Sequence, residues 1–135
     1  MVTTDKKILL VDDNDNVREL FADFMKGLGY NVLEAATGLE AIDLASRVRP
    51  DLIIIDLRLP DMNGADAIAR LKADRSNRDI PLVVITGYGA GVDTSRALDA
   101  GAAEILHKPV DFTSLKNVLR RHLLERTTKN SSQKK

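Results

Sequence analysis

The stretch Leu52-Ile-Ile-Ile-Asp56 is followed directly by Leu57-Arg-Leu-Pro-Asp-Met-Asn-Gly64. Four consecutive apolar residues are typical of a strand buried on both faces of a parallel sheet, and the turn-rich segment after them predicts a loop. An acid at the end of such a strand is costly to bury unless a cation lies beside it. Asp56 is therefore the first candidate for a functional residue.

Three further apolar runs have polar residues at or just beyond their ends. These are Ile8–Val11 with Asp12-Asp13, Leu82–Ile85 with Thr86, and Ile105-Leu106 with Lys108-Pro109. The carboxyl ends of the strands in an open α/β sheet share one edge, and ligands bind in the crevice beyond it. We therefore expect these residues, which are distant in the sequence, to meet at one site.

Short apolar runs alternate with amphipathic segments along the chain, which predicts five βα units in an α/β fold with a doubly wound parallel sheet. We expect strands at 8–11, 31–34, 52–56, 82–86 and 105–106. Helices are expected between and after them, the clearest over 17–28 and the least amphipathic over 92–100.

Two helices have recognisable starts in the sequence. Thr37 and Glu40 have the spacing of a capping box at the start of the second helix. Asp111 is expected to cap the last helix, and an apolar face follows it. That face consists of Phe112, Leu115, Leu119 and Leu123.

The composition limits the class of protein. The chain has 135 residues, the size of one domain, and its formal net charge of zero favours neither nucleic acid nor an anionic membrane as a partner. The absence of cysteine excludes disulfides and thiolate metal sites. No apolar run approaches ~18 residues, so we expect a cytoplasmic protein. We expect a single domain at 1–126 and a disordered tail at 127–135, where the sequence has no apolar residue.

Each polar residue also has a simpler interpretation when taken alone. The acids at 12–15 could only cap and charge the first helix, Thr86 could be an ordinary strand residue, and Lys108 a solvated surface lysine. Together, a carboxylate, a hydroxyl and an ammonium are the groups that stabilise a transferring phosphoryl group. Acids gathered around Asp56 favour a hard divalent ion such as Mg²⁺, with Ca²⁺ as an alternative.

In order and spacing, these motifs resemble the receiver domain of two-component response regulators, over about Lys6 to Arg126. The resemblance implies a flavodoxin-like (βα)5 fold with strand order 2-1-3-4-5. It also implies a signalling protein that accepts a phosphoryl group from a sensor histidine kinase or a histidine phosphotransfer protein. Such a protein is not an enzyme beyond its own phosphorylation and dephosphorylation, and is a monomer or a phosphorylation-dependent dimer.

The resemblance further implies a role for each site residue. Asp56 is the phosphoacceptor, and Thr86 and Lys108 contact the phosphoryl group. Mg²⁺ is held by Asp13, Asp56 and the backbone carbonyl of Arg58, while Asp12 acts through water. The resemblance also implies a cis peptide bond between Lys108 and Pro109.

The resemblance implies that the signal leaves through the surface of the fourth helix, fifth strand and fifth helix. Many receivers have Tyr or Phe three residues before the lysine, but this chain has Ile105, so we do not expect an aromatic switch there. Tyr88 is then the candidate for a moving ring. Arg58 and Tyr88 stand at two positions that tune phosphate lifetime in the family, and their bulk predicts a long-lived phosphoryl group.

Other classes of protein stay open as alternatives. One is a non-phosphorylated pseudo-receiver scaffold, although none of the key residues is missing. A second is an aspartate-nucleophile phosphatase, which would need an acid where the chain has Arg58. A third is a flavodoxin-like cofactor binder, whose phosphate the acids at 12–15 would repel. We expect structural roles for His107 and His122, because neither lies in a metal-ligand or triad spacing.

Overall fold

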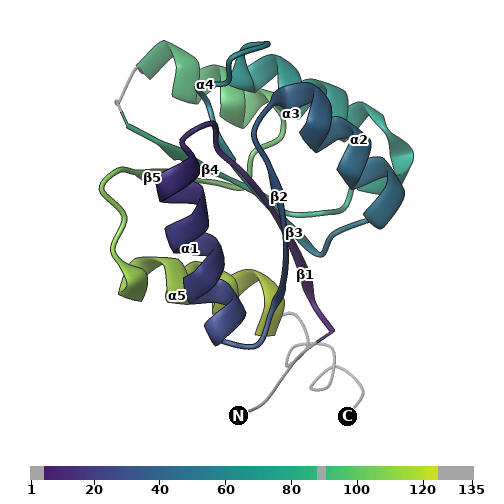
Figure 1. Ribbon diagram of the computed structural model, residues 1–135. Helices are drawn as coiled ribbons and strands as arrows, with labels where there is room; N and C mark the ends of the chain where they lie inside the picture. Colours follow the sequence, from purple (N-terminus) through teal and green to yellow (C-terminus); the bar gives the residue numbers. More distant parts are fainter. Residues whose placement is uncertain (1–4, 88–90, 125–135) are drawn as a thin grey trace, which may run out of the picture.

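The structure, a computed structural model, describes residues 5–87 and 91–124. Five parallel strands form one sheet in the order β2-β1-β3-β4-β5 (Figure 1). The strands are β1 (Lys7–Val11), β2 (Asn31–Ala35), β3 (Leu52–Asp56), β4 (Leu82–Thr86) and β5 (Glu104–His107). The predicted α/β class, flavodoxin-like (βα)5 fold and strand order 2-1-3-4-5 are confirmed.

Helices cover both faces of this sheet. They are α1 (Asp15–Gly27), α2 (Gly38–Val48), α3 (Gly64–Ala73), α4 (Gly91–Ala100) and α5 (Phe112–Leu119), with a 3-10 turn η1 (Arg75–Asn77) and a π-helical turn η2 (Arg120–Leu124). α1 and α5 lie against one face, and α2, α3 and α4 lie against the other (Figure 1). The helices therefore leave the carboxyl ends of the strands free at one edge.

The central strands are buried on both faces. All residues of β3 and β4 are buried, which accounts for their continuous apolar sequence. Successive side chains of β3 enter two separate cores, because they point to opposite faces of the sheet. Ile53 and Ile55 pack on the α2–α3–α4 side, whereas Ile54 packs with Met25 of α1 on the other side. Asp56 is thus held by a strand whose other residues are fixed in the core.

Polar side chains cap four of the helices. The N-caps are Asn14, Thr37, Asn63 and Asp111, and each accepts a hydrogen bond from a backbone N–H two or three residues later. At α2, Oγ1 of Thr37 accepts from the N–H of Glu40 at 3.1 Å, as the capping-box spacing predicts. The carboxylate of Glu40 accepts from Ala36 at 2.7 Å, one residue before the expected partner.

Some boundaries differ from the prediction. β2 and β5 extend beyond 31–34 and 105–106, and α4 begins one residue before 92. The sequence does not predict η1 or η2, because a single tight or wide turn leaves little trace in the apolar spacing. Phe112, on the apolar face expected for the last helix, is 40% exposed and stacks on Phe24, with ring centroids 4.3 Å apart.

The expected tail at 127–135 and Tyr88 lie outside the described residues. Over 5–87 and 91–124, none of the helices combines the length and the apolar character that a membrane span requires.

Candidate functional site

Four strands bring polar residues to the same edge of the sheet. Asp12 follows the last residue of β1, and Asp56 and Thr86 are the last residues of β3 and β4. Lys108 directly follows β5. Lys108 and Asp12 are 96 positions apart in the sequence, yet their side chains form a hydrogen bond. The expected meeting of these strand ends is therefore present in the structure.

The ammonium of Lys108 joins acids from two strands. Its Nζ lies 2.8 Å from Oδ2 of Asp56 and 3.2 Å from Oδ2 of Asp12. The Lys108 side chain is 25% exposed, and the two acids are buried. Burial lowers the pKa of Lys108, but the hydrogen bond to Asp56 and the charges of both acids outweigh it and hold the pKa above its ordinary value. Lys108 is therefore a fixed cation of the site and not a solvated surface lysine.

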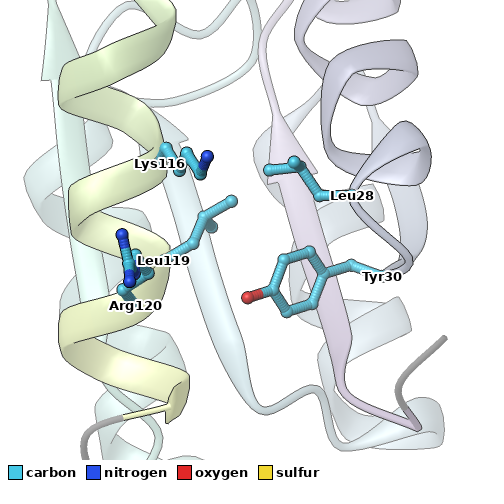
Figure 2. A pocket seen from close by; sticks show the side chains of 5 residues that line it. All are labelled: Leu28, Tyr30, Lys116, Leu119 and Arg120. Carbon is cyan, nitrogen blue, oxygen red and sulfur yellow. The ribbon is translucent and has the colours of Figure 1, made fainter. Parts of the chain in front are cut away.

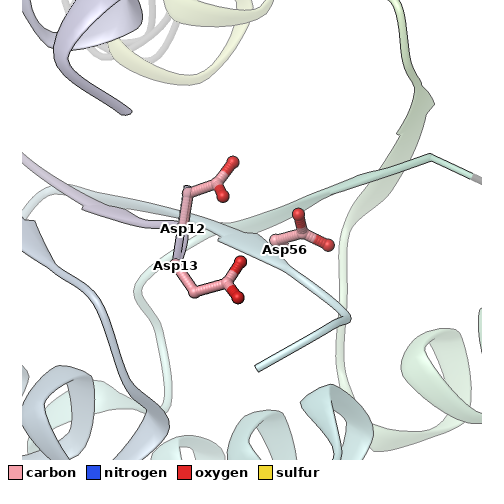
Figure 3. Close-up of side chains that lie close together, drawn as sticks. All are labelled: Asp12, Asp13 and Asp56. Carbon is pink, nitrogen blue, oxygen red and sulfur yellow. The ribbon is translucent and has the colours of Figure 1, made fainter. Parts of the chain in front are cut away.

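Asp13 completes a group of three acids, here called the carboxylate cluster (Asp12, Asp13 and Asp56). One carboxylate oxygen of each lies within 4.8 Å of those of the other two (Figure 3). Asp12 and Asp56 are buried, whereas Asp13 is exposed. Three like charges at this separation repel one another, and a single ammonium offsets only part of that repulsion. The donor set fits a hard divalent cation such as Mg²⁺, which takes carboxylate oxygens and keeps several waters on an open side.

Backbone donors orient the two buried acids of the carboxylate cluster. The N–H of Asn14 donates to Oδ1 of Asp12 at 2.9 Å. The N–H of Arg58 donates to Oδ1 of Asp56 at 3.0 Å. Each buried acid thus has one oxygen held by the backbone, while its other oxygen contacts Lys108.

Arg18 of α1 contacts the backbone of the carboxylate cluster at Asp12. Its Nη1 donates to the carbonyl oxygen of Asp12 at 2.8 Å, and its Nε donates to Glu34 of β2 at 3.0 Å. Its Nη2 also pairs with Asp15 at 2.8 Å. Arg18 is not among the site residues predicted from the sequence. Arg18 lies three residues after Asp15 on the same helix, a spacing that predicts an ion pair between their side chains. The contact with the Asp12 carbonyl depends instead on how α1 packs.

The loop after β3 closes tightly around Arg58. The N–H of Gly64 donates to the carbonyl of Leu57 at 3.0 Å, and Arg58 forms an isolated antiparallel bridge with Asn63. A Cβ at position 64 would lie 2.5 Å from Cα of Leu57, so this closure requires glycine. The closure fixes the backbone of Arg58, while the Arg58 side chain is exposed.

Thr86 lies at the same edge, beside Lys108. Its carbonyl oxygen accepts from the N–H of Lys108 at 2.8 Å, and the residue is 4% exposed. Asp56 pairs in register with Ile85, which places Thr86 one residue further along the neighbouring strand. The peptide bond between Lys108 and Pro109 is cis, as the resemblance implies.

Residues 8–120 match the family described as the response regulator receiver domain. The chain belongs to the response regulator receiver family. Receivers are signalling domains and not classical enzymes. One relative, the polar-differentiation response regulator DivK of Brucella anthropi, is 32% identical over 118 residues, which are 87% of this chain and 96% of that protein.

Solved receivers have the same fold. The chemotaxis response regulator CheY4 of Vibrio cholerae matches with a TM-score of 0.83 at 29% identity, covering 89% of this chain and 100% of that one. The receiver domain of a sensor histidine kinase of Pseudomonas aeruginosa PAO1 matches with a TM-score of 0.82 at 32% identity, covering 88% of this chain and 98% of that one. The Pseudomonas structure has a magnesium ion coordinated in its active site cleft.

Neither histidine of this receiver belongs to the carboxylate cluster. His107 is exposed at the end of β5. Nε2 of His122 lies 2.9 Å from Oε2 of Glu104, and Arg121 pairs with the other oxygen of that carboxylate. His122 thus joins η2 to β5, which fits the structural role expected for it.

Proposed function

We propose that this receiver accepts a phosphoryl group on Asp56, from a histidine kinase or a histidine phosphotransfer protein, in a reaction that needs Mg²⁺. The observation that carries the proposal is the position of Lys108, whose Nζ lies 2.8 Å from Asp56 and 3.2 Å from Asp12. A cation already fixed beside the attacking carboxylate offsets negative charge as the phosphoryl group approaches. Thr86, at the end of the next strand, would donate its hydroxyl to a phosphoryl oxygen.

The carboxylate cluster and the backbone carbonyl of Arg58 would hold Mg²⁺, with Asp12 acting through water. Support comes from the carboxylate oxygens, which lie within 4.8 Å of one another, and from the exposure of Asp13 on the solvent side. The bound ion supplies positive charge to the acids and to the oxygens of the phosphoryl group.

The transfer itself is a displacement at phosphorus. A carboxylate oxygen of Asp56 forms a bond to phosphorus, and the bond between phosphorus and the donor breaks. With a phosphohistidine donor, the electron pair of the broken bond stays on the imidazole nitrogen, which then takes up a proton. Because the pKa of Lys108 is raised, its ammonium would stay charged and act by hydrogen bonding, not as a proton carrier.

The signal would leave through the surface formed by α4, β5 and α5. Lys108 directly follows β5, so a new contact between Lys108 and a phosphoryl group would bias the conformation of that surface. Ile105 of β5 is half-buried against the α2–α3–α4 core and carries no ring to rotate. We propose movement of Thr86 toward the phosphoryl group as the coupling step, in a cytoplasmic protein that is a monomer or dimerises on phosphorylation.

Intact-mass spectrometry after incubation with acetyl phosphate tests the proposal. Wild type should gain one phosphate with MgCl2 and none with EDTA, and Asp56→Asn should gain none in either buffer. Asp43→Asn is the matched control, because Asp43 is an exposed acid that pairs with Arg47 on α2, and this variant should label like wild type. Equal labelling of wild type and Asp56→Asn would falsify the assignment of Asp56.

A further inference from the structure

A small pocket lies at the opposite end of the sheet from the carboxylate cluster. It has a volume of about 280 Å³ and lies between the end of α1 and the helix formed by α5 and η2 (Figure 2). Its lining residues are Leu28, Tyr30, Lys116, Leu119 and Arg120. We call it the amino-end pocket, because Tyr30 directly precedes β2 whereas the carboxylate cluster lies at the carboxyl ends of the strands.

Tyr30 directs its hydroxyl into the amino-end pocket. The residue is 8% exposed, and its phenol oxygen points across the pocket toward α5 (Figure 2). Burial raises the pKa of Tyr30 and outweighs the opposing charge of Arg120, so the phenol is a donor at neutral pH. The hydroxyl is therefore available to donate a hydrogen bond to a ligand oxygen in the pocket.

The rim of the pocket carries the positive charges of Lys116 and Arg120. Lys116 and Arg120 are four residues apart, and both are exposed. In the part of the chain that the structure describes, neither has a carboxylate within ion-pair distance, whereas Arg18 and Arg47 do. An anion at this rim would therefore meet two cations that form no ion pair with an acid of residues 5–87 or 91–124.

The inner wall of the pocket is apolar. Leu119 is fully buried and Leu28 is half-buried, so the cations and the phenol surround a hydrocarbon surface. The π-helical turn η2 begins at Arg120, and such turns are frequent at functional sites. The sequence after η2 has four basic residues and one acid, so its charge does not favour it as the occupant; these residues are Glu125, Arg126, Lys129, Lys134 and Lys135.

We propose that the amino-end pocket binds a small organic carboxylate with an apolar body. The carboxylate would accept hydrogen bonds from Arg120, Lys116 and the Tyr30 hydroxyl, while the hydrocarbon part lies against Leu28 and Leu119. The volume of about 280 Å³ is just below the usual range for ligand sites, about 300–1,000 Å³, which restricts the ligand to roughly one ring or a short chain. This site does not depend on the phosphoacceptor function proposed above.

Titration of the isotope-labelled full chain with sodium benzoate, followed by NMR, tests the proposal. Wild type should show saturable shifts at the pocket residues. Arg120→Gln should weaken binding by about tenfold, because it removes a charge-assisted hydrogen bond. Tyr30→Phe should weaken it by a smaller factor. Arg75→Gln is the matched control, since Arg75 is an exposed arginine on η1, and its affinity should equal that of wild type.

Two further probes separate the contributions of charge and apolar surface. Benzyl alcohol has the ring without the charge, and inorganic phosphate has charge without the ring, so both should bind at least about tenfold more weakly than benzoate. Equal affinity of benzoate and benzyl alcohol, equal affinity of wild type and Arg120→Gln, or shifts that never saturate would each overturn the proposal. Arg120→Gln should still be labelled by acetyl phosphate, so failure of this proposal is distinguishable from failure of the phosphoacceptor proposal.

Discussion

Lys108 neutralises part of the charge that the three acids of the carboxylate cluster bring together. It contacts Asp56 and Asp12 where both are buried, and Asp13 adds a third negative charge within 4.8 Å. Buried charges are stabilised by their partners and not by solvent. The loss of one partner therefore leaves the remaining charges destabilised. The position of a lysine two residues beyond a short apolar run does not reveal this role, because the acids come from other strands.

Replacing Lys108 by Met keeps a long apolar stem but removes the charge. We expect Lys108→Met to lower the free energy of unfolding by about 1–3 kcal/mol without Mg²⁺, since two buried acids lose their cation, with a discount for the partial exposure of Lys108. MgCl2 should then stabilise the variant more than it stabilises wild type. Urea unfolding followed by circular dichroism, with EDTA or MgCl2, measures both effects.

Lys116→Met is the control for this experiment, because Lys116 is an exposed lysine without an ion pair among the described residues. Its stability should stay within about 0.5 kcal/mol of wild type in both buffers. If MgCl2 stabilised wild type and Lys108→Met equally, Lys108 would not be balancing the acids.

At the scale of elements, the connection from β3 to α3 shapes the site through its backbone. Gly64 approaches Leu57 so closely that a Cβ would lie 2.5 Å from the Leu57 Cα. Backbone atoms on both sides of this contact cannot move aside as a flexible side chain can. The N–H of Arg58, which holds Asp56, lies within the segment that this contact closes.

Gly64→Ala should therefore destabilise the protein, by about 1–3 kcal/mol, and should also weaken Mg²⁺ binding by displacing the loop. Gly27→Ala is the matched change, because nothing lies within 4 Å of a Cβ at this last residue of α1. It should raise stability by about 0.4–1 kcal/mol through the lower entropy of the unfolded chain. Thermal unfolding of both variants measures the contrast, and a destabilised Gly27→Ala or a neutral Gly64→Ala would contradict it.

Glu104 of β5 links the sheet to η2 through His122 and Arg121. Burial raises the pKa of Glu104, but the hydrogen bonds and charges of these two partners outweigh it and hold the pKa below its ordinary value. A carboxylate whose pKa is lower in the folded state stabilises the fold above its unfolded pKa of about 4.3. That contribution is lost as the pH falls through the folded pKa.

Glu104→Gln should lower the free energy of unfolding at neutral pH by up to about 1 kcal/mol, because the pairs are partly exposed. The difference from wild type should shrink as the pH falls from about 5 to about 3, where the wild-type carboxylate also becomes neutral. Urea midpoints across this range give the comparison. A difference that stays constant with pH would mean that the Glu104 charge does not contribute.

The strands were predictable because each central strand is a continuous apolar run, which a sheet covered on both faces requires. The run from Leu52 to Asp56 is buried throughout, and its predicted bounds are those of β3. Helix ends were less predictable, since they depend on partners elsewhere. The π-helical turn η2 keeps Leu119 and Leu123 in the same core, so the sequence spacing fits an unbroken helix equally well.

At the scale of the whole molecule, the parallel sheet places the carboxyl ends of all its strands at one edge, although the strands are distant in the sequence. That rule alone predicts that Asp12, Asp56, Thr86 and Lys108 lie at one place. It could not give the contacts that orient them. The hydrogen bond from Arg18 to the Asp12 carbonyl depends on the packing of α1, which no local pattern encodes.

The same limit applies at the other end of the sheet. Tyr30 and Arg120 are 90 positions apart in the sequence, and neither belongs to a motif. The amino-end pocket exists because α1 and α5 pack on one face, so its residues meet only in the folded chain (Figure 1).

We propose that Asp56, alone among the acids of the carboxylate cluster, becomes an acyl phosphate. Borohydride reduces an acyl phosphate to an alcohol, so a phosphorylated aspartate is converted to homoserine. After labelling with acetyl phosphate and MgCl2, reduction, digestion and tandem mass spectrometry should find homoserine at position 56 and intact aspartate at positions 12 and 13. Homoserine at position 12 or 13, or none at position 56 in a chain that has gained a phosphate, would contradict the account.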